Sequence, residues 1–327
     1  MDNVIDRIFA DCKGILAADE SSPTIKKRLE SVGKESTIET RHSYRHNLFS
    51  TEGLSKYIGG VILFEETLKS PETIAPLKDG GIVLGIKVDQ GTSPYGEEGG
   101  KLTNGLEGLE ERLCEYKDLG AEFAKWRAVI SVTDDDKCLF ANSLALGQYA
   151  KACQYAGIVP IVEPEVLMDG EHDIYDSFKM TEKVLHFLFE ALYHLEVPIE
   201  KIILKPNMIM HGYKNPWGSS SSCCSSPPQD IALATLNCFK RCVPAAVPAI
   251  AFLSGGQRDE IAIESLKVMN EEEYLPWTLS FSFGRTMQSG ALKMWGENKM
   301  EDARLWTFNR ARECSKATCG NKYLEWN

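Results

Sequence analysis

A lysine stands at the end of a short apolar run, in the sequence Ile202-Ile203-Leu204-Lys205-Pro206. Three consecutive apolar residues predict a strand buried on both faces, and the proline ends its pairing. A buried ammonium is unfavourable unless it is paired or loses its proton, so burial favours the neutral amine of Lys205. A neutral amine attacks carbonyl carbon, which makes Lys205 a candidate for Schiff-base chemistry. The alternative is a side chain that only reaches out to water.

Carboxylates and further cations follow other apolar runs of the chain. Glu163 and Glu165 share one face of an extended segment because they are two residues apart, and so do Lys125 and Arg127. An imine forms only when the carbinolamine oxygen leaves as water. We expect Glu163 to supply that proton, since the like charge of Glu165 favours its protonated form, while Lys125 opposes this effect and orients the pair. Asp19 is the carboxylate available as a base when a bond next to the imine breaks.

Two groups of residues have the composition of phosphate sites. Glycine N–H groups and a guanidinium commonly hold phosphate after the seventh and eighth strands of barrel enzymes, and the first group supplies them: Ser254, Gly255, Gly256, Ser282, Gly284 and Arg285. The second group joins basic side chains to two hydroxyls: Ser21, Thr24, Lys27, Arg28 and Lys87, with Arg127 as a further substrate-binding cation. Lys26 and Lys27 are equally consistent with the solvated face of a helix. A ligand with phosphates at two ends and a ketone between them is a ketose bisphosphate.

The elements that must position these residues repeat along the chain. A short apolar or β-branched run is followed by an amphipathic helical stretch eight times, which is typical of an α/β fold, the (β/α)8 TIM barrel, formed here as a single domain over residues 1–327. In such a barrel the chemistry lies at the carboxyl ends of the strands, where the polar residues gather. The alternative is a doubly wound open sheet, but no Gly-x-Gly-x-x-Gly follows the first run.

The predicted strands are residues 14–19, 60–65, 81–88, 123–131, 158–163, 201–205, 248–253 and 278–283. The predicted helices include residues 24–31, 106–119, 143–156, 175–195, 230–242 and 259–269, with Gly157 as a helix stop. Residues 218–228 depart from the pattern because they are rich in Ser and Cys, and we expect a flexible loop over the active face.

Composition and charge exclude several classes of function. The chain has a formal net charge of −11, which argues against nucleic-acid binding, and no apolar run is long enough for insertion into a membrane. The first residues resemble neither a secretory signal nor a transit peptide, so we expect a cytoplasmic protein. The histidines are scattered and no His-Glu-x-x-His is present, so we expect no metal and no cofactor. The ten cysteines include no Cys-x-x-Cys pair, and we expect reduced thiols rather than disulfides.

Seven motifs together resemble class I fructose-bisphosphate aldolase: residues 14–21, 59–64, 85–89, 123–127, 159–165, 204–208 and 252–257. The resemblance implies reversible, metal-independent cleavage of fructose 1,6-bisphosphate to dihydroxyacetone phosphate and glyceraldehyde 3-phosphate, in glycolysis and gluconeogenesis, by a homotetramer. It also implies that Lys205 is the Schiff-base lysine, that Glu163 is the general acid and base, and that Asp19, Lys125 and Glu165 support them. It places Ser254, Gly255, Ser282, Gly284 and Arg285 at the 1-phosphate, and Thr24, Arg28 and Lys87 at the other end.

Two other functions are also consistent with the sequence. One is a Schiff-base aldolase for another ketose phosphate, which substrate profiling distinguishes. The other is a secondary scaffold role, in which the protein binds actin filaments or adhesin tails, as aldolases that this chain resembles can do.

Overall fold

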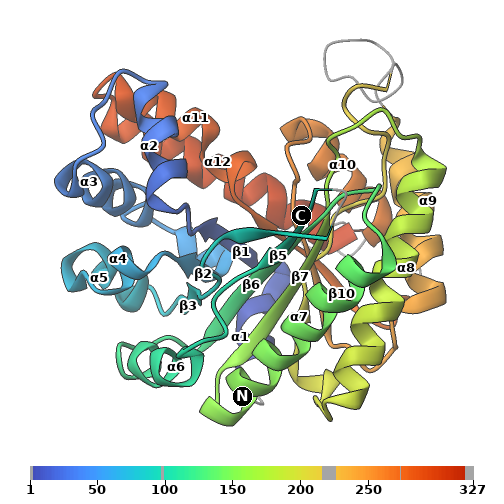
Figure 1. Cartoon of the computed structure of the whole chain (residues 1–327). Coiled ribbons are helices and arrows are strands. Elements are labelled where there is room, and N and C mark those ends of the chain that lie inside the picture. Colours follow the sequence, from blue (N-terminus) through green and yellow to red (C-terminus); the bar gives the residue numbers. More distant parts are fainter. Residues whose placement is uncertain (1–2, 97–98, 216–225, 273, 321–327) are drawn as a thin grey trace.

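The strands close into one parallel barrel, as the sequence predicts. The computed structural model describes residues 3–96, 99–215, 226–272 and 274–320. The barrel strands follow one another in the order β1-β10-β9-β8-β7-β6-β3-β2, with helices outside them (Figure 1). Their bounds are β1 Gly14–Ala18, β2 Ile58–Leu63, β3 Val83–Lys87, β6 Phe123–Ile130, β7 Val159–Val166, β8 Ile203–Leu204, β9 Ala249–Phe252 and β10 Thr278–Phe283.

Helices cover the outer face of the barrel, and a further helix closes its amino end. The α-helices are α1 Val4–Phe9, α2 Ser22–Glu30, α3 Ile38–Phe49, α4 Glu65–Leu68, α5 Pro71–Asp79, α6 Leu109–Asp118, α7 Asp136–Ala156, α8 Ile174–His194, α9 Pro228–Cys242, α10 Asp259–Asn270, α11 Arg285–Gly296 and α12 Met300–Cys319. Short 3-10 helices are η1 Ala10–Cys12, η2 Leu54–Lys56 and η3 Ile199–Lys201. Each of the predicted helices is confirmed, with shifted ends. Gly157 ends α7 in the left-handed conformation (φ 75°), as predicted.

Alternation along the strands divides the apolar core into two layers. One set of side chains packs between the strands and the surrounding helices, and the other fills the inside of the barrel. Ile8 of α1 belongs to the inner set, so α1 acts as a plug at the amino end. Gly59 in β2 permits this contact, because a Cβ there would lie 2.0 Å from the Ile8 carbonyl oxygen. The inside of the barrel is therefore packed at one end and open to chemistry at the other.

A hairpin that the sequence pattern does not predict lies beside the open end. Strands β4 Thr92–Tyr95 and β5 Gly100–Thr103 pair antiparallel between β3 and α6. The Thr103 hydroxyl donates to the Arg127 carbonyl at 2.8 Å, which fixes the hairpin to β6. Strand β7 also extends past its predicted end at residue 163 to Val166, so Glu163 and Glu165 lie within the strand.

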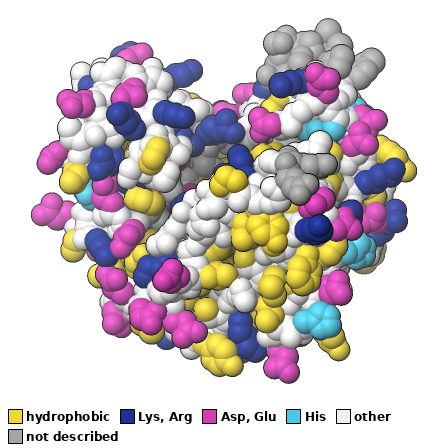
Figure 2. Space-filling model, in the orientation of Figure 1, with side chains coloured by type: hydrophobic (Ala, Val, Ile, Leu, Met, Phe, Trp, Pro, Cys, Tyr) yellow, Lys and Arg dark blue, Asp and Glu magenta, His cyan; other side chains and the backbone are white. Residues whose placement is uncertain are grey.

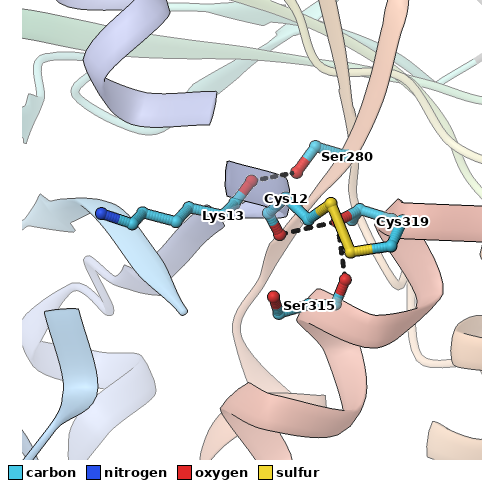
Figure 3. Close-up of a disulfide and its surroundings, with 6 residues drawn as sticks. Cys12, Lys13, Ser280, Ser315 and Cys319 are labelled. Atoms are coloured by element: carbon cyan, nitrogen blue, oxygen red, sulfur yellow. Dashed lines mark hydrogen bonds between the residues drawn. A yellow bond between two sulfur atoms is a disulfide. The ribbon is translucent and has the colours of Figure 1, made fainter. Parts of the chain in front are cut away.

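The expectation that the cysteines are reduced is wrong for one pair. Cys12 at the end of η1 and Cys319 at the end of α12 form a disulfide, with their Cα atoms 5.4 Å apart (Figure 3). Beside the disulfide, the hydroxyl of Ser280 donates to the carbonyl of Lys13. The disulfide therefore lies where β1 begins, at the amino end of the barrel. Sequence spacing could not reveal the pair, because its members are 307 positions apart. The other cysteines that the structure describes are free thiols: Cys114, Cys138, Cys153, Cys238, Cys242 and Cys314.

Two further expectations from the sequence concern a membrane span and the loop at residues 218–228. None of the helices in the described part of the chain is long and apolar enough to cross a membrane. Most of the predicted loop at 218–228 lies outside the described residues, which resume at Ser226 just before α9.

Candidate active site

One cavity of about 580 Å³ lies at the carboxyl ends of the barrel strands. With the exceptions of Lys27 and Gly256, the residues that the sequence assigns to the site line this cavity: Asp19, Ser21, Thr24, Arg28, Lys87, Lys125, Arg127, Glu163, Glu165, Lys205, Ser254, Gly255, Ser282, Gly284 and Arg285. Figure 2 shows the molecule hollowed between the side of α2 and the side of α10, with basic side chains at the opening. The alternation of the strands and their common direction bring these distant residues together.

Lys205 and Glu163 are a buried pair at the centre of this cavity. The backbone N–H of Lys205 donates to the Val162 carbonyl at 2.8 Å, which continues the β7–β8 pairing past the end of β8. Lys205 is 4% exposed and Glu163 is 3% exposed, so both side chains point inward rather than to water. The Lys205 Nζ lies 3.2 Å from Glu163 Oε1, and a proton can pass directly between them. The reading of Lys205 as a side chain that reaches out to solvent is thereby excluded.

Lys125 links this pair to Asp19, the carboxylate that follows β1. Its Nζ lies 3.4 Å from the second oxygen of Glu163 and 2.8 Å from Asp19 Oδ2. Burial alone would lower the pKa of Lys125, but the carboxylates of Asp19, Glu163 and Asp89 outweigh burial and raise it. Burial likewise opposes ionisation of Asp19, yet Lys125 and Lys205 together hold the pKa of Asp19 far below its usual range. Lys125 is therefore a fixed cation and Asp19 a fixed anion.

Arg127 and Glu165 form a second pair, one layer nearer the opening. The Arg127 Nε donates to Glu165 Oε2, and both side chains line the cavity. Burial works against the charge on Arg127, but Glu165 outweighs it and raises the pKa of the guanidinium. Because the two side chains neutralise each other, Glu165 repels a negative charge on Glu163 less than an unpaired carboxylate would.

One group of hydrogen-bond donors follows β9 and β10. Arg285 begins α11, and Ser254 and Gly255 follow β9. The hydroxyl of Ser282 is buried and has no hydrogen-bond partner among the described residues, so a donor is left for a ligand. Gly256 does not line the cavity, but its lack of a side chain leaves space for the Arg285 guanidinium, because a Cβ there would lie 2.5 Å from Arg285 Nη2.

The second group lies where β1 and β3 end. The hydroxyls of Ser21 and Thr24 lie 3.2 Å apart at the start of α2, and Arg28 lies one turn further along. Lys87 Nζ lies 2.6 Å from Asp89 Oδ1. Lys27, which the sequence groups with Arg28, is exposed on α2 and does not line the cavity.

Several residues that hold the site together are missing from the sequence-based assignment. Asp89 contacts both Lys87 and Lys125, and the signal for it was its position two residues after Lys87. Glu20, which follows Asp19 at the end of β1, pairs with Arg28 and is 7% exposed. Lys101 reaches the cavity from the unpredicted hairpin, and Gln288 reaches Glu20 from α11, which no local pattern could indicate.

Metal ligands are not clustered in this site. Across the residues that the structure describes, no three His, Cys, Asp or Glu side chains are placed together so that they could hold a metal ion. The charged groups at the centre instead alternate in sign, as Lys205, Glu163, Lys125 and Asp19 do.

Comparison with known proteins gives one consistent result. The family model described as "Fructose-bisphosphate aldolase class-I" matches residues 1–326. The chain is 46% identical to "Probable fructose-bisphosphate aldolase class 1" of Xylella fastidiosa, over 96% of this chain and 95% of that protein. It is 42% identical to "Fructose-bisphosphate aldolase B" of Gallus gallus, over 99% of this chain and 90% of that protein.

A solved structure agrees with these matches. It is the fructose-bisphosphate aldolase of Plasmodium falciparum, in a ternary complex with TRAP and a small-molecule inhibitor. The two chains superpose with a TM-score of 0.92 at 40% sequence identity, over 97% of this chain and 93% of the other.

Proposed function

We propose that this chain, which belongs to the class I fructose-bisphosphate aldolases, cleaves its substrate through a Schiff base on Lys205. The family reaction is the reversible cleavage of fructose 1,6-bisphosphate to dihydroxyacetone phosphate and glyceraldehyde 3-phosphate, a lyase step of glycolysis. One observation carries the assignment: the amine of Lys205 is buried beside Glu163 in a cavity with cationic groups on two sides. Those cationic groups suit a ligand with two phosphates.

Imine formation moves two protons from the nitrogen to the departing oxygen. The Lys205 ammonium gives the first to Glu163 across 3.2 Å, the freed amine attacks the C2 carbonyl carbon of the ketose, and the second passes from the nitrogen to the oxygen, which gives the carbinolamine. Glu163 returns the proton to the carbinolamine hydroxyl, which leaves as water, and the iminium remains. Lys125 beside Glu163 favours return of the proton, because it stabilises the carboxylate that results.

Cleavage of the C3–C4 bond needs an acceptor for the proton of the C4 hydroxyl. Asp19 is ionised at physiological pH because Lys125 and Lys205 lower its pKa, so it is always ready to accept. A carboxylate with a lowered pKa is a weak base, so transfer occurs together with bond breaking, when the hydroxyl proton becomes acidic. The C3–C4 electron pair moves into the iminium and forms an enamine, and the aldehyde product leaves. Protonation of the enamine and hydrolysis of the imine restore Lys205.

Phosphate binding places the ketone at Lys205. Ser254, Gly255, Ser282, Gly284 and Arg285 would hold the 1-phosphate through N–H, hydroxyl and guanidinium donors. The other phosphate would lie against a second set of donors: Ser21, Thr24, Arg28, Lys87 and Arg127. Holding both ends fixes the C2 carbon near the amine, which is the positional part of the catalysis.

A cleavage assay with fructose 1,6-bisphosphate in excess chelator tests the proposal. Triose phosphate release is measured through a coupled NADH reaction, for the native chain and for Lys205→Met. We expect metal-independent turnover in the native chain and loss of at least about 10⁴-fold in the variant, since covalent catalysis is then impossible. Equal turnover by the two proteins, or complete inhibition by the chelator, would contradict the proposal.

We also propose that the protein is a homotetramer in the cytoplasm. Large apolar side chains are exposed on neighbouring helices, including Tyr155 (80%) on α7 and Tyr193 (78%) on α8, and Figure 2 shows hydrophobic side chains gathered over this part of the molecule. A groove at this place is lined by Leu106, Leu109, Ala152, Tyr155 and Leu195, together with the polar side chains of Glu110, Gln148 and Lys151. Apolar surface of this kind is typical of a subunit interface. Sedimentation equilibrium tests the proposal; a monomer at micromolar concentration would contradict it.

Binding of actin filaments or adhesin tails is a second role that we propose for the same fold. The relative from Plasmodium falciparum, solved in complex with TRAP, supports partner binding by this fold. The net charge of −11 requires a basic patch on this chain for any acidic partner, so binding should weaken steeply with salt and persist in the Lys205→Met variant. Co-sedimentation with filaments and pull-down with tail peptides measure this.

A further inference from the structure

A buried hydrogen-bond network lies behind the cavity and connects its two cationic ends. Gln288, on α11, is 2% exposed and does not line the cavity. Its amide nitrogen donates to the Ala17 carbonyl and to Glu20 Oε1, both at 2.8 Å. Its amide oxygen accepts from the Tyr44 hydroxyl at 3.1 Å. One side chain thus joins α11 to the end of β1, to the loop after β1 and to α3.

The orientation of this amide is dictated by its surroundings. The Ala17 carbonyl and the Glu20 carboxylate only accept hydrogen bonds, so they require the two N–H donors of Gln288. Tyr44 then meets the remaining oxygen as a donor. No other arrangement of the amide satisfies all three partners, and burial makes each unsatisfied group costly.

Both arginines at the phosphate ends depend on this amide. Arg285 is the first residue of α11 and lies one turn before Gln288, so Gln288 anchors the helix end that presents Arg285. Glu20 Oε1 accepts from Arg28 Nη1 and from Gln288 at the same time. A guanidinium has five N–H donors, and since Glu20 engages Nη1, donors remain for a phosphate.

Arg45 completes the support of Glu20 from the opposite side. It is 1% exposed, and its Nη2 donates to the Glu20 backbone carbonyl at 2.9 Å, while Nη1 donates to the Thr67 hydroxyl at 2.7 Å. The Glu20 backbone is thus held by Arg45, and its Oε1 is held by Arg28 and Gln288, while Oε2 lies 4.0 Å from Arg45 Nη2. Glu20 therefore transmits the position of Gln288 to Arg28 instead of relaxing around it.

We infer that Gln288 is a positioning residue that fixes the span between the two phosphate-binding arginines, and so selects substrates that carry a phosphate at each end. This inference rests on the proposed function. Gln288 touches no substrate and acts through Arg28 and Arg285. Its hydrogen bonds contribute most to kcat/KM when both arginines must be in place at once, as they must for a ketose bisphosphate. A ketose with only a 1-phosphate makes no demand on Arg28.

Steady-state kinetics with two substrates test the inference. Gln288→Met keeps the length of the side chain and removes its hydrogen bonds. We expect kcat/KM for fructose 1,6-bisphosphate to fall roughly 10- to 100-fold, because Arg28 and Arg285 are both misplaced, and kcat/KM for fructose 1-phosphate to fall less, because only Arg285 acts on it. The specificity ratio therefore falls. A merely structural role would lower the two values in parallel, and that result would overturn the inference.

A double-mutant cycle shows whether the effect passes through Arg28. In the Arg28→Met background the second phosphate has already lost its guanidinium, so adding Gln288→Met should leave the specificity ratio unchanged. An undiminished further fall of the ratio would overturn the inference. If Gln288→Met does not fold, Tyr44→Phe removes a single hydrogen bond of the network, and it should lower the ratio less, in the same direction; no change would count against the inference.

The same experiment separates this inference from the proposed function. A native chain that cleaves neither substrate contradicts the proposed function, and the inference with it. A native chain that cleaves both, with a specificity ratio that Gln288→Met does not alter, contradicts the inference alone.

Discussion

Replacing Lys125 with methionine should move the acid limb of the pH–rate profile to higher pH. The Lys125 ammonium lies 2.8 Å from Asp19, 3.4 Å from Glu163 and 3.6 Å from Asp89, so the change leaves three carboxylates with less positive charge around them. Methionine keeps much of the side-chain volume and removes only the charge and its hydrogen bonds.

The sign follows from the pKa of Asp19. In the native protein Lys125 and Lys205 hold this pKa far below its usual range, so Asp19 stays ionised as the pH falls. Two unit charges 2.8 Å apart interact by about 6 kcal/mol at an effective dielectric constant of about 20, which is an upper limit because water and Lys205 compensate in part. A lost cation at this distance typically raises a carboxylate pKa by about 1–3 units. The rise in the Asp19 pKa therefore moves the acid limb to higher pH.

The assay is kcat/KM for fructose 1,6-bisphosphate measured across the pH range in which the variant remains folded. We expect the acid limb to rise by about 1–3 pH units and the rate at neutral pH to fall by about 100-fold or more. Lys125→Arg, which keeps the charge, is the matched control; its rate falls because the guanidinium has another shape, but its acid limb stays near the native position. An acid limb that does not move in Lys125→Met would refute the electrostatic role given to this lysine.

Three further predictions concern stability. Reduction of the Cys12–Cys319 disulfide, or Cys12→Ser, should lower the free energy of unfolding by about 2–5 kcal/mol, since the bond closes nearly the whole chain; a urea midpoint that is the same with and without reductant would contradict this. Gly59→Ala should cost about 1–3 kcal/mol, because its Cβ would collide with the Ile8 carbonyl, and an unchanged melting temperature would contradict that contact. The pKa of Asp19 is lower in the folded than in the unfolded protein, so its ion pairs stabilise the fold above the unfolded pKa of about 3.9, and this stabilisation is lost as the pH falls toward the folded pKa. Asp19→Asn should therefore make the free energy of unfolding fall less steeply below about pH 4. Urea unfolding at several acid pH values measures this.

Local pattern accounts for the parts of the fold that the sequence predicts. Strands of a parallel barrel are buried on both faces, so they appear as short continuous apolar runs, and 202–204 is one of them. The polar residues that interrupt such runs at their ends, such as Lys205 and Asp19, are costly to bury, which is why they indicate a site. The common direction of the strands then brings them to one cavity.

Contacts between distant segments account for what the sequence does not reveal. The Cys12–Cys319 bond joins the two ends of the chain, and no spacing rule connects such positions. Glu20 and Gln288 are likewise 268 positions apart, and each is unremarkable within its own segment. In the β4–β5 hairpin, β4 is mostly exposed and β5 is only half-buried, and neither has a clear apolar alternation. The hairpin therefore gives a weak strand signal, although it adds Lys101 to the cavity.

Trapping the covalent intermediate tests the Schiff base on Lys205 most directly. The native chain is incubated with dihydroxyacetone phosphate and borohydride, and the protein is then digested and its peptides are identified by mass spectrometry. We expect one stable adduct per chain, on Lys205, with loss of activity in proportion to labelling, and no adduct in Lys205→Met. An adduct on another lysine, or cleavage activity that survives complete labelling of Lys205, would contradict it.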